Sequence, residues 1–235
     1  MNIFGAFTFG SLIKTFLPGL VWLLAILMLE IDVARMLNVE PPLWTFVKTK
    51  DQAALVLAIP ASILIGLISN IVVFMGINDW LVRIPVRRRN RDLCALYDAL
   101  AQRIRERCWA SLKDAAPGLK GAFDSNIDPE VVALHTIGVE KLAYLREQYW
   151  YHLEFQLNLL LSLAAMAVAL VLLIVMSAAS AELRAALILT CIAVATLIMA
   201  ALLKAARKNY CRHVAKMASM MAAVLCPADS ETLPH

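Results

Sequence analysis

The chain has 235 residues, of which 61% are hydrophobic, and it carries a formal net charge of +4. An ordinary soluble domain is about 45 to 50% apolar, and the mean hydropathy here is +0.72, so the composition excludes most soluble globular folds. The small basic excess is mixed with acidic residues, which argues against nucleic-acid binding and fits contact with anionic lipid headgroups.

Four segments are apolar enough to cross a bilayer, which takes about 20 residues of helix. We therefore expect an all-α integral membrane protein with spans at about 12–29, 53–77, 153–176 and 183–203. The chain then divides into a transmembrane hairpin (1–80), a cytoplasmic helical hairpin (81–152), a second transmembrane hairpin (153–204) and a cytoplasmic C-terminal helix and tail (205–235).

The first span has more than one interpretation. The leading segment MNIFGAFTFGSLIK carries a single lysine, Lys14, and the IDVARM sequence after the span is a poor small-residue cleavage site, so we expect a retained anchor rather than a signal peptide. Pro18 and Gly19 shorten the uninterrupted apolar run to residues 20–29. A re-entrant or interfacial segment is therefore the alternative.

Basic residues gather after the second and fourth spans and are scarce in the other loops. Because basic residues near span ends stay on the cytoplasmic side, we expect both termini and segment 81–152 to be cytoplasmic. The membrane is then the plasma membrane, or the inner membrane of a Gram-negative bacterium. The residues expected to contact inner-leaflet lipid are Arg83, Arg87, Arg88, Arg89, Lys204, Arg207 and Lys208.

Segment 81–152 predicts two helical stretches separated by a turn. Pro85 is expected to break the helix that leaves the membrane. The breaker-rich stretch 114–130 predicts the turn, which closes with Asp128 as N-cap and Pro129 in the first helical position, and one helix is expected from there to Met176. Apolar residues of the first helix recur at spacings of three and four, at Leu93, Leu96, Leu100, Ile104 and Cys108.

The fourth span continues without a helix breaker until Pro227. The stripe Val214, Met217, Met221 and Leu225 predicts packing in a cytoplasmic bundle, which we prefer to a Met-rich binding surface. The five cysteines are scattered and show no metal-ligand spacing, so we expect reduced thiols.

A polar stripe runs along one face of the third span. Glu154, Asn158 and Ser162 follow one another at spacings of four, so they share a helix face. They must turn away from lipid, because a polar group left in hydrocarbon costs several kcal/mol. The same layer is expected to hold three residues from the second and fourth spans, Ser69, Asn70 and Thr196.

Two functions fit this layer. In the first, the chain is a homo-oligomeric membrane pore or ion channel that is lined by the layer and gated by the cytoplasmic helices. In the second, it is a non-conducting membrane scaffold or partner subunit that recruits another protein through those helices. The layer then only joins helices, with Asn70 bonded to Asn158 and Glu154 paired with Arg83 or Arg87. The pore is preferred because the stripe continues into the span.

Enzyme signatures are missing from the sequence. It contains no metalloprotease, hydrolase, nucleotide-binding or dinucleotide motif, and its four histidines lack partners at useful spacing. We expect no catalytic residue, no metal and no cofactor. The expected partners are the lipid bilayer, further copies of the chain and a cytoplasmic protein, and not nucleic acid.

Overall fold

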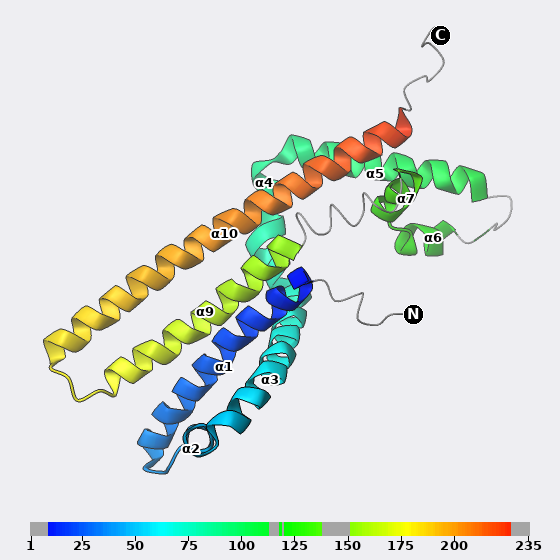
Figure 1. Cartoon of the computed structure of the whole chain (residues 1–235). Helices are drawn as coiled ribbons and strands as arrows, with labels where there is room; N and C mark the ends of the chain where they lie inside the picture. Colours follow the sequence, from blue (N-terminus) through cyan, green and yellow to red (C-terminus); the bar gives the residue numbers. More distant parts are fainter. Residues whose placement is uncertain (1–8, 113–117, 119, 138–150, 227–235) are drawn as a thin grey trace, which may run out of the picture. The chain divides into compact units, whose positions relative to one another are not determined.

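The computed structural model describes residues 9–112, 118, 120–137 and 151–226, which form helices joined by short turns (Figure 1). The all-α prediction is confirmed for this part of the chain. In chain order the elements are α1 (Phe9–Leu37), α2 (Pro42–Thr49), α3 (Asp51–Val72), the π-helical segments η2 (Val73–Ile77) and η3 (Asp79–Arg83), α4 (Ile84–Arg89), α5 (Arg91–Leu112), α6 (Lys120–Asn126), α7 (Pro129–Ile137), α9 (Tyr151–Val175) and α10 (Ala181–Leu225).

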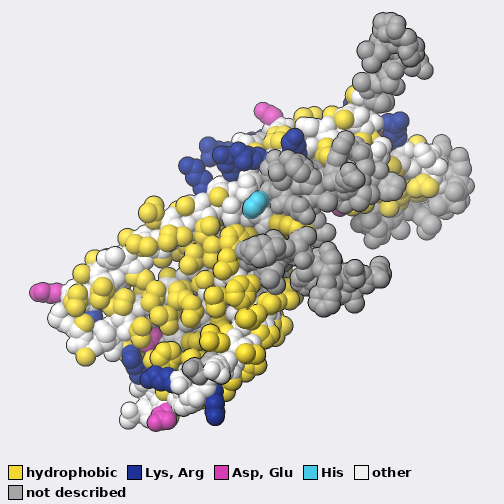
Figure 2. All heavy atoms as spheres, in the orientation of Figure 1, with side chains coloured by type: hydrophobic (Ala, Val, Ile, Leu, Met, Phe, Trp, Pro, Cys, Tyr) yellow, Lys and Arg dark blue, Asp and Glu magenta, His cyan; other side chains and the backbone are white. Residues whose placement is uncertain are grey.

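Four helices are long and apolar enough to cross a membrane: Lys14–Leu37, Gln52–Ile77, Tyr151–Val175 and Ala181–Leu225. Hydrophobic side chains cover much of the face of these spans that Figure 2 shows. By length and composition the four predicted spans are confirmed, which indicates a multi-pass membrane protein.

The chain separates into two compact units. The first comprises the described residues of Met1–Val82 and Tyr151–Arg207, and the second those of Arg83–Trp150 and Lys208–His235. Helix α10 contributes its first part to one unit and its last part to the other.

Helices α1 and α3 of the first unit pack backbone against backbone. A Cβ atom added to Gly19 would lie 1.7 Å from the carbonyl oxygen of Ser62, and one added to Gly66 would lie 2.0 Å from that of Thr15. On α1, Gly19 lies four positions after Thr15, and on α3, Gly66 lies four positions after Ser62. Each helix therefore contributes one glycine to the contact, and small residues often allow such close approach in membranes. Helix α1 also packs along α9.

The first span is one continuous helix. It runs through Pro18, whose side chain is fully buried, and it ends at Leu37 rather than near residue 29. Membrane helices tolerate an internal proline because neighbouring groups satisfy the freed backbone carbonyl, so the re-entrant alternative is not supported. Glu30, within α1, accepts backbone hydrogen bonds from Leu43 (2.6 Å) and Trp44 (3.1 Å) at the start of α2, a short helix that the sequence did not predict.

The prediction that Pro85 breaks the helix that follows the second span is wrong. The helical backbone continues through η2 and η3 into α4, where Pro85 occupies the first turn and needs no backbone N–H partner. The bend lies earlier, at Gly76 (φ 175°, ψ −30°). The helix ends at Arg89 with Asn90 as its C-cap, and α5 begins at Arg91.

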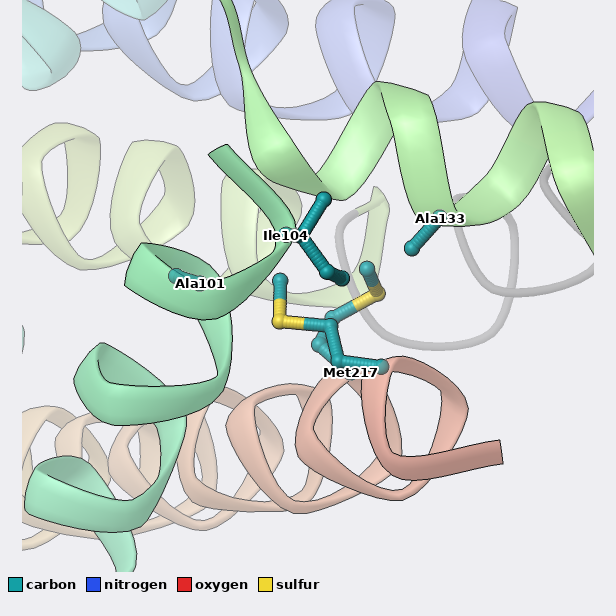
Figure 3. Close-up of a cluster of buried hydrophobic side chains, with 5 residues drawn as sticks. Ala101, Ile104, Ala133 and Met217 are labelled. Atoms are coloured by element: carbon teal, nitrogen blue, oxygen red, sulfur yellow. The ribbon is translucent and has the colours of Figure 1, made fainter. Parts of the chain in front are cut away.

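The second unit has its own hydrophobic core. Ala101 and Ile104 of α5, Ala133 of α7 and Met217 and Met221 of α10 are buried against one another (Figure 3). The predicted core role of the Met217 stripe is confirmed, as is the continuation of the fourth span to Leu225.

Three details of this unit differ from the expectations or lie outside the described residues. Leu96, predicted to face inward, is 52% exposed. The stretch expected to be a turn contains α6, although its end is as predicted: the Glu130 backbone N–H donates to Asp128 Oδ1 (2.9 Å), which caps α7. The long helix expected from Pro129 to Met176 cannot be followed throughout, because residues 138–150 lie outside the described part.

Candidate functional site

Four polar side chains from α1, α3 and α9 form a connected chain of hydrogen bonds in the first unit. Trp22 Nε1 donates to Ser69 Oγ (3.2 Å), and Ser69 Oγ donates to Asn158 Oδ1 (3.1 Å). Asn158 Nδ2 in turn donates to Asn70 Oδ1 (2.9 Å). The predicted contact between Asn70 and Asn158 is therefore confirmed, and it lies within one chain.

This network satisfies its most buried member. Asn158 has no exposed surface, while its amide accepts one bond and donates another. An amide without partners at this depth would cost several kcal/mol, whereas a paired one contributes modestly. The network therefore joins α1, α3 and α9 to one another. Trp22, its fourth member, was missed because the sequence offers only an isolated tryptophan in an apolar run.

Glu154 lies on the same face of α9 and pairs with Lys14 of α1. The two side chains are only 10% and 16% exposed, and the Lys14 ammonium also lies 4.2 Å from the centre of the Tyr151 ring. The expectation that Glu154 turns away from lipid is confirmed. The proposed pairing with Arg83 or Arg87 is replaced by the pair with Lys14, which only a three-dimensional packing of α1 on α9 reveals.

The other residues predicted for the polar layer divide into two groups. Ser162 is fully buried, and its hydroxyl donates to the Leu159 carbonyl oxygen of its own helix (3.0 Å). Thr196 is not part of the layer, because its side chain is exposed on α10. The depth predicted for Thr196 came from its residue count to Lys204, which could not show which way α10 is turned.

The basic residues predicted to contact lipid also divide. Arg207 Nε donates to the Leu81 carbonyl oxygen (2.9 Å), and Arg87 makes two contacts with Asp98 (3.2 and 3.3 Å). These two residues therefore have partners within their own units. Arg87 is nevertheless exposed, as are Arg83, Arg88, Arg89, Lys204 and Lys208.

One buried carboxylate was not predicted. Asp32, near the end of α1, is 2% exposed, and neither of its oxygens accepts a hydrogen bond in the described part of the chain. It was missed because the predicted span stopped before it. No group of three or more His, Cys, Asp or Glu side chains that could hold a metal occurs among the described residues.

A polar cluster within the second unit joins α5, α7 and α10. The Tyr97 hydroxyl donates to Glu130, and His213 Nε2 lies 3.7 Å from the other Glu130 oxygen. Burial alone would raise the pKa of Glu130, but hydrogen bonds from His213 and Tyr97 and attraction to His213 and Arg83 hold it below the ordinary value of 4.5. Burial and the carboxylate raise the pKa of Tyr97, so the phenol remains a donor.

Comparison of the chain with protein-family models, with curated proteins and with solved structures gave no match.

Proposed function

We propose that the chain is a non-conducting membrane scaffold subunit, in which the four spans anchor the helical second unit at the cytoplasmic surface. The observation that carries this proposal is the complete burial of Asn158 within a single chain. A residue that lines a conduit between subunits must face the subunit boundary, whereas Asn158 is fully buried and its amide is bonded to Ser69 and Asn70 of α3.

The charge on Glu154 supports the same conclusion. A ring of carboxylates at a pore mouth attracts cations only if each carboxylate faces the permeating ion. Here Lys14 neutralises the carboxylate inside the same chain. The polar layer that made a pore attractive therefore serves to hold three spans together.

The second unit supplies the surface that a scaffold needs. It has its own core, and polar and charged side chains cover the outer positions of α5, among them Gln102, Arg103 and Glu106. The arginines that follow the second span favour the cytoplasmic side for this unit. A soluble or membrane protein docked there is the partner class that the proposal requires.

The test combines two measurements on the full chain. First, purified protein is reconstituted into liposomes, and potassium and chloride flux is compared with that of empty liposomes; no added flux is expected. Second, a photo-crosslinking amino acid is placed in living cells at Arg103 or, as a matched control, at the lipid-facing Leu189 of α10, which is 69% exposed. A discrete heteromeric adduct only from position 103 is expected. If the wild type conducts and Asn158→Ala changes that flux, the scaffold proposal is wrong and the pore hypothesis is supported.

A further inference from the structure

An apolar slot of about 420 Å³ lies between α9 and α10 in the first unit. Its walls come from the halves of the two helices nearest their connecting turn, and they include Leu163, Ala167 and Leu170 on α9 and Cys191 and Ala195 on α10. No residue in the most apolar window of the α10 span is buried within the chain. We propose that this slot binds one acyl chain of a phospholipid, whose phosphate is held by Arg184.

Water is a poor occupant of the slot. Its only hydroxyl, that of Thr190, donates to the Ala186 carbonyl oxygen of its own helix (2.8 Å), and Cys191 offers only a weakly polar thiol. An apolar cavity without convergent polar groups stays dry, and an empty one forfeits packing contacts. Acyl chains surround a helix that spans the membrane, so hydrocarbon is available to fill the slot.

The dimensions favour a hydrocarbon chain over a helix. The lining residues of α9 run from Leu163 to Ile174, a rise of about 16 Å along the helix. Over that length a slot of 420 Å³ has walls about 9 Å apart on average, once the radius of a water molecule is added on each side, whereas a helix with its side chains is about 10 to 12 Å wide. A transmembrane helix from a partner or from a second copy therefore does not fit between α9 and α10.

Arg184 gives the slot a polar end. It lies three residues before Leu187 on the face of α10 that lines the slot, at the turn between the two helices. Its Nη1 donates to the Val175 carbonyl oxygen (3.2 Å), while its buried Nε–H has no hydrogen-bond partner in the described part of the chain. Protein atoms cover the Nε–H, so a phosphate at the membrane interface would pair with the outer N–H groups of the partly exposed guanidinium, whose fork suits phosphate geometry.

Photo-crosslinking with a labelled lipid tests the proposal. The full chain is reconstituted into vesicles of phosphatidylethanolamine and phosphatidylglycerol that contain a trace of phosphatidylcholine with a diazirine at mid-chain. After irradiation, adducts are mapped by mass spectrometry. We expect them on the peptides that contain residues 163–174 and 187–198. Ala195→Phe should lower this labelling about tenfold, because the ring occupies the slot. Ala193→Phe, two residues away on an exposed face, is the matched control and should leave it unchanged.

Ala167→Phe fills the same slot from α9 and should also lower the labelling. Agreement between the two variants would show that the loss does not come from a folding defect of Ala195→Phe alone. Arg184→Gln should weaken labelling while the melting curve stays within the range of Ala193→Phe. Equal labelling of Ala195→Phe, Ala167→Phe and Ala193→Phe would overturn the acyl-chain site, and labelling indifferent to Arg184→Gln would overturn the phosphate contact. A disulfide between Cys191 of two copies on mild oxidation, abolished by Ala195→Phe, would show instead that a second copy covers the slot.

Discussion

Lys14 and Glu154 form an ion pair between α1 and α9 inside the first unit, with both side chains largely shielded from solvent. Removing one partner leaves the other charge buried, which costs up to about 3 to 5 kcal/mol. We therefore expect Glu154→Gln to lower the thermal stability of the detergent-solubilised protein. The exposed Glu182 of α10 supplies the control, because Glu182→Gln should leave the melting temperature nearly unchanged.

The double variant Lys14→Met with Glu154→Leu removes both charges and fills similar space. It should melt near the wild-type temperature or above it, since replacing a buried pair with apolar groups is often neutral or stabilising. If Glu154→Gln were as stable as the wild type and altered ion permeability, the carboxylate would be a pore residue.

Asn158 is the centre of the hydrogen-bond network. Asn158→Ala and Asn70→Ala should each destabilise the first unit by about 0.5 to 2 kcal/mol, because hydrogen bonds within a membrane are modest in strength. A double-mutant cycle between the two positions should give a coupling energy of the same order, since they bond directly. Thr196→Ala, on the exposed face of α10, is the control and should lie within about 0.5 kcal/mol of the wild type. A zero coupling energy would contradict the network.

Gly19 and Gly66 have no room for a side chain against the backbone of the facing helix. Gly19→Ala and Gly66→Ala should therefore force α1 and α3 apart and weaken the first unit, even though alanine is the better helix former by about 1 kcal/mol. Gly121→Ala in α6 meets nothing within 4 Å and should be neutral or stabilising. Thermal unfolding of the three variants side by side checks the sign, and a stabilised Gly19→Ala would show that the helices are farther apart.

The sequence predicted features that depend on one helix at a time. Hydrophobic length predicted the four spans, and the spacing of Glu154, Asn158 and Ser162 predicted which face of α9 turns inward. The Asp128 cap also follows from local rules. The interaction partners of these side chains were harder to predict, because Lys14 lies 140 positions from Glu154 and no local sequence pattern connects the two residues. The prediction that Thr196 belongs to the polar layer was wrong for a related reason. The expected depth of this residue follows from residue count, but the rotation of α10 about its axis depends on tertiary packing.

Topology can be tested by thiol labelling in a background without native cysteines. From the arginine runs we expect a cysteine introduced at Leu43 or Ala179 to lie on the outer side, where an impermeant reagent added to intact cells should reach it. Cysteines at position 113 and near the C-terminus should react only after the membrane is opened; both positions lie outside the described part of the chain. Outside labelling at position 113 would reverse the orientation and move the scaffold surface to the opposite side.

Glu130 makes the second unit sensitive to acid. Its carboxyl has a pKa below 4.5 in the folded protein, so the carboxylate stabilises the fold above the unfolded pKa, and this contribution is lost as the pH falls through the lower folded value. The melting temperature of the wild type should therefore fall more steeply below about pH 4.5 than that of Glu130→Gln, which has no proton to take up. Tyr97→Phe removes one of the two hydrogen bonds to the carboxylate and should reduce the steepness in part. Circular dichroism melts from pH 3 to pH 7 compare the three proteins, and parallel curves for wild type and Glu130→Gln would show that this carboxyl is not preferentially ionised in the fold.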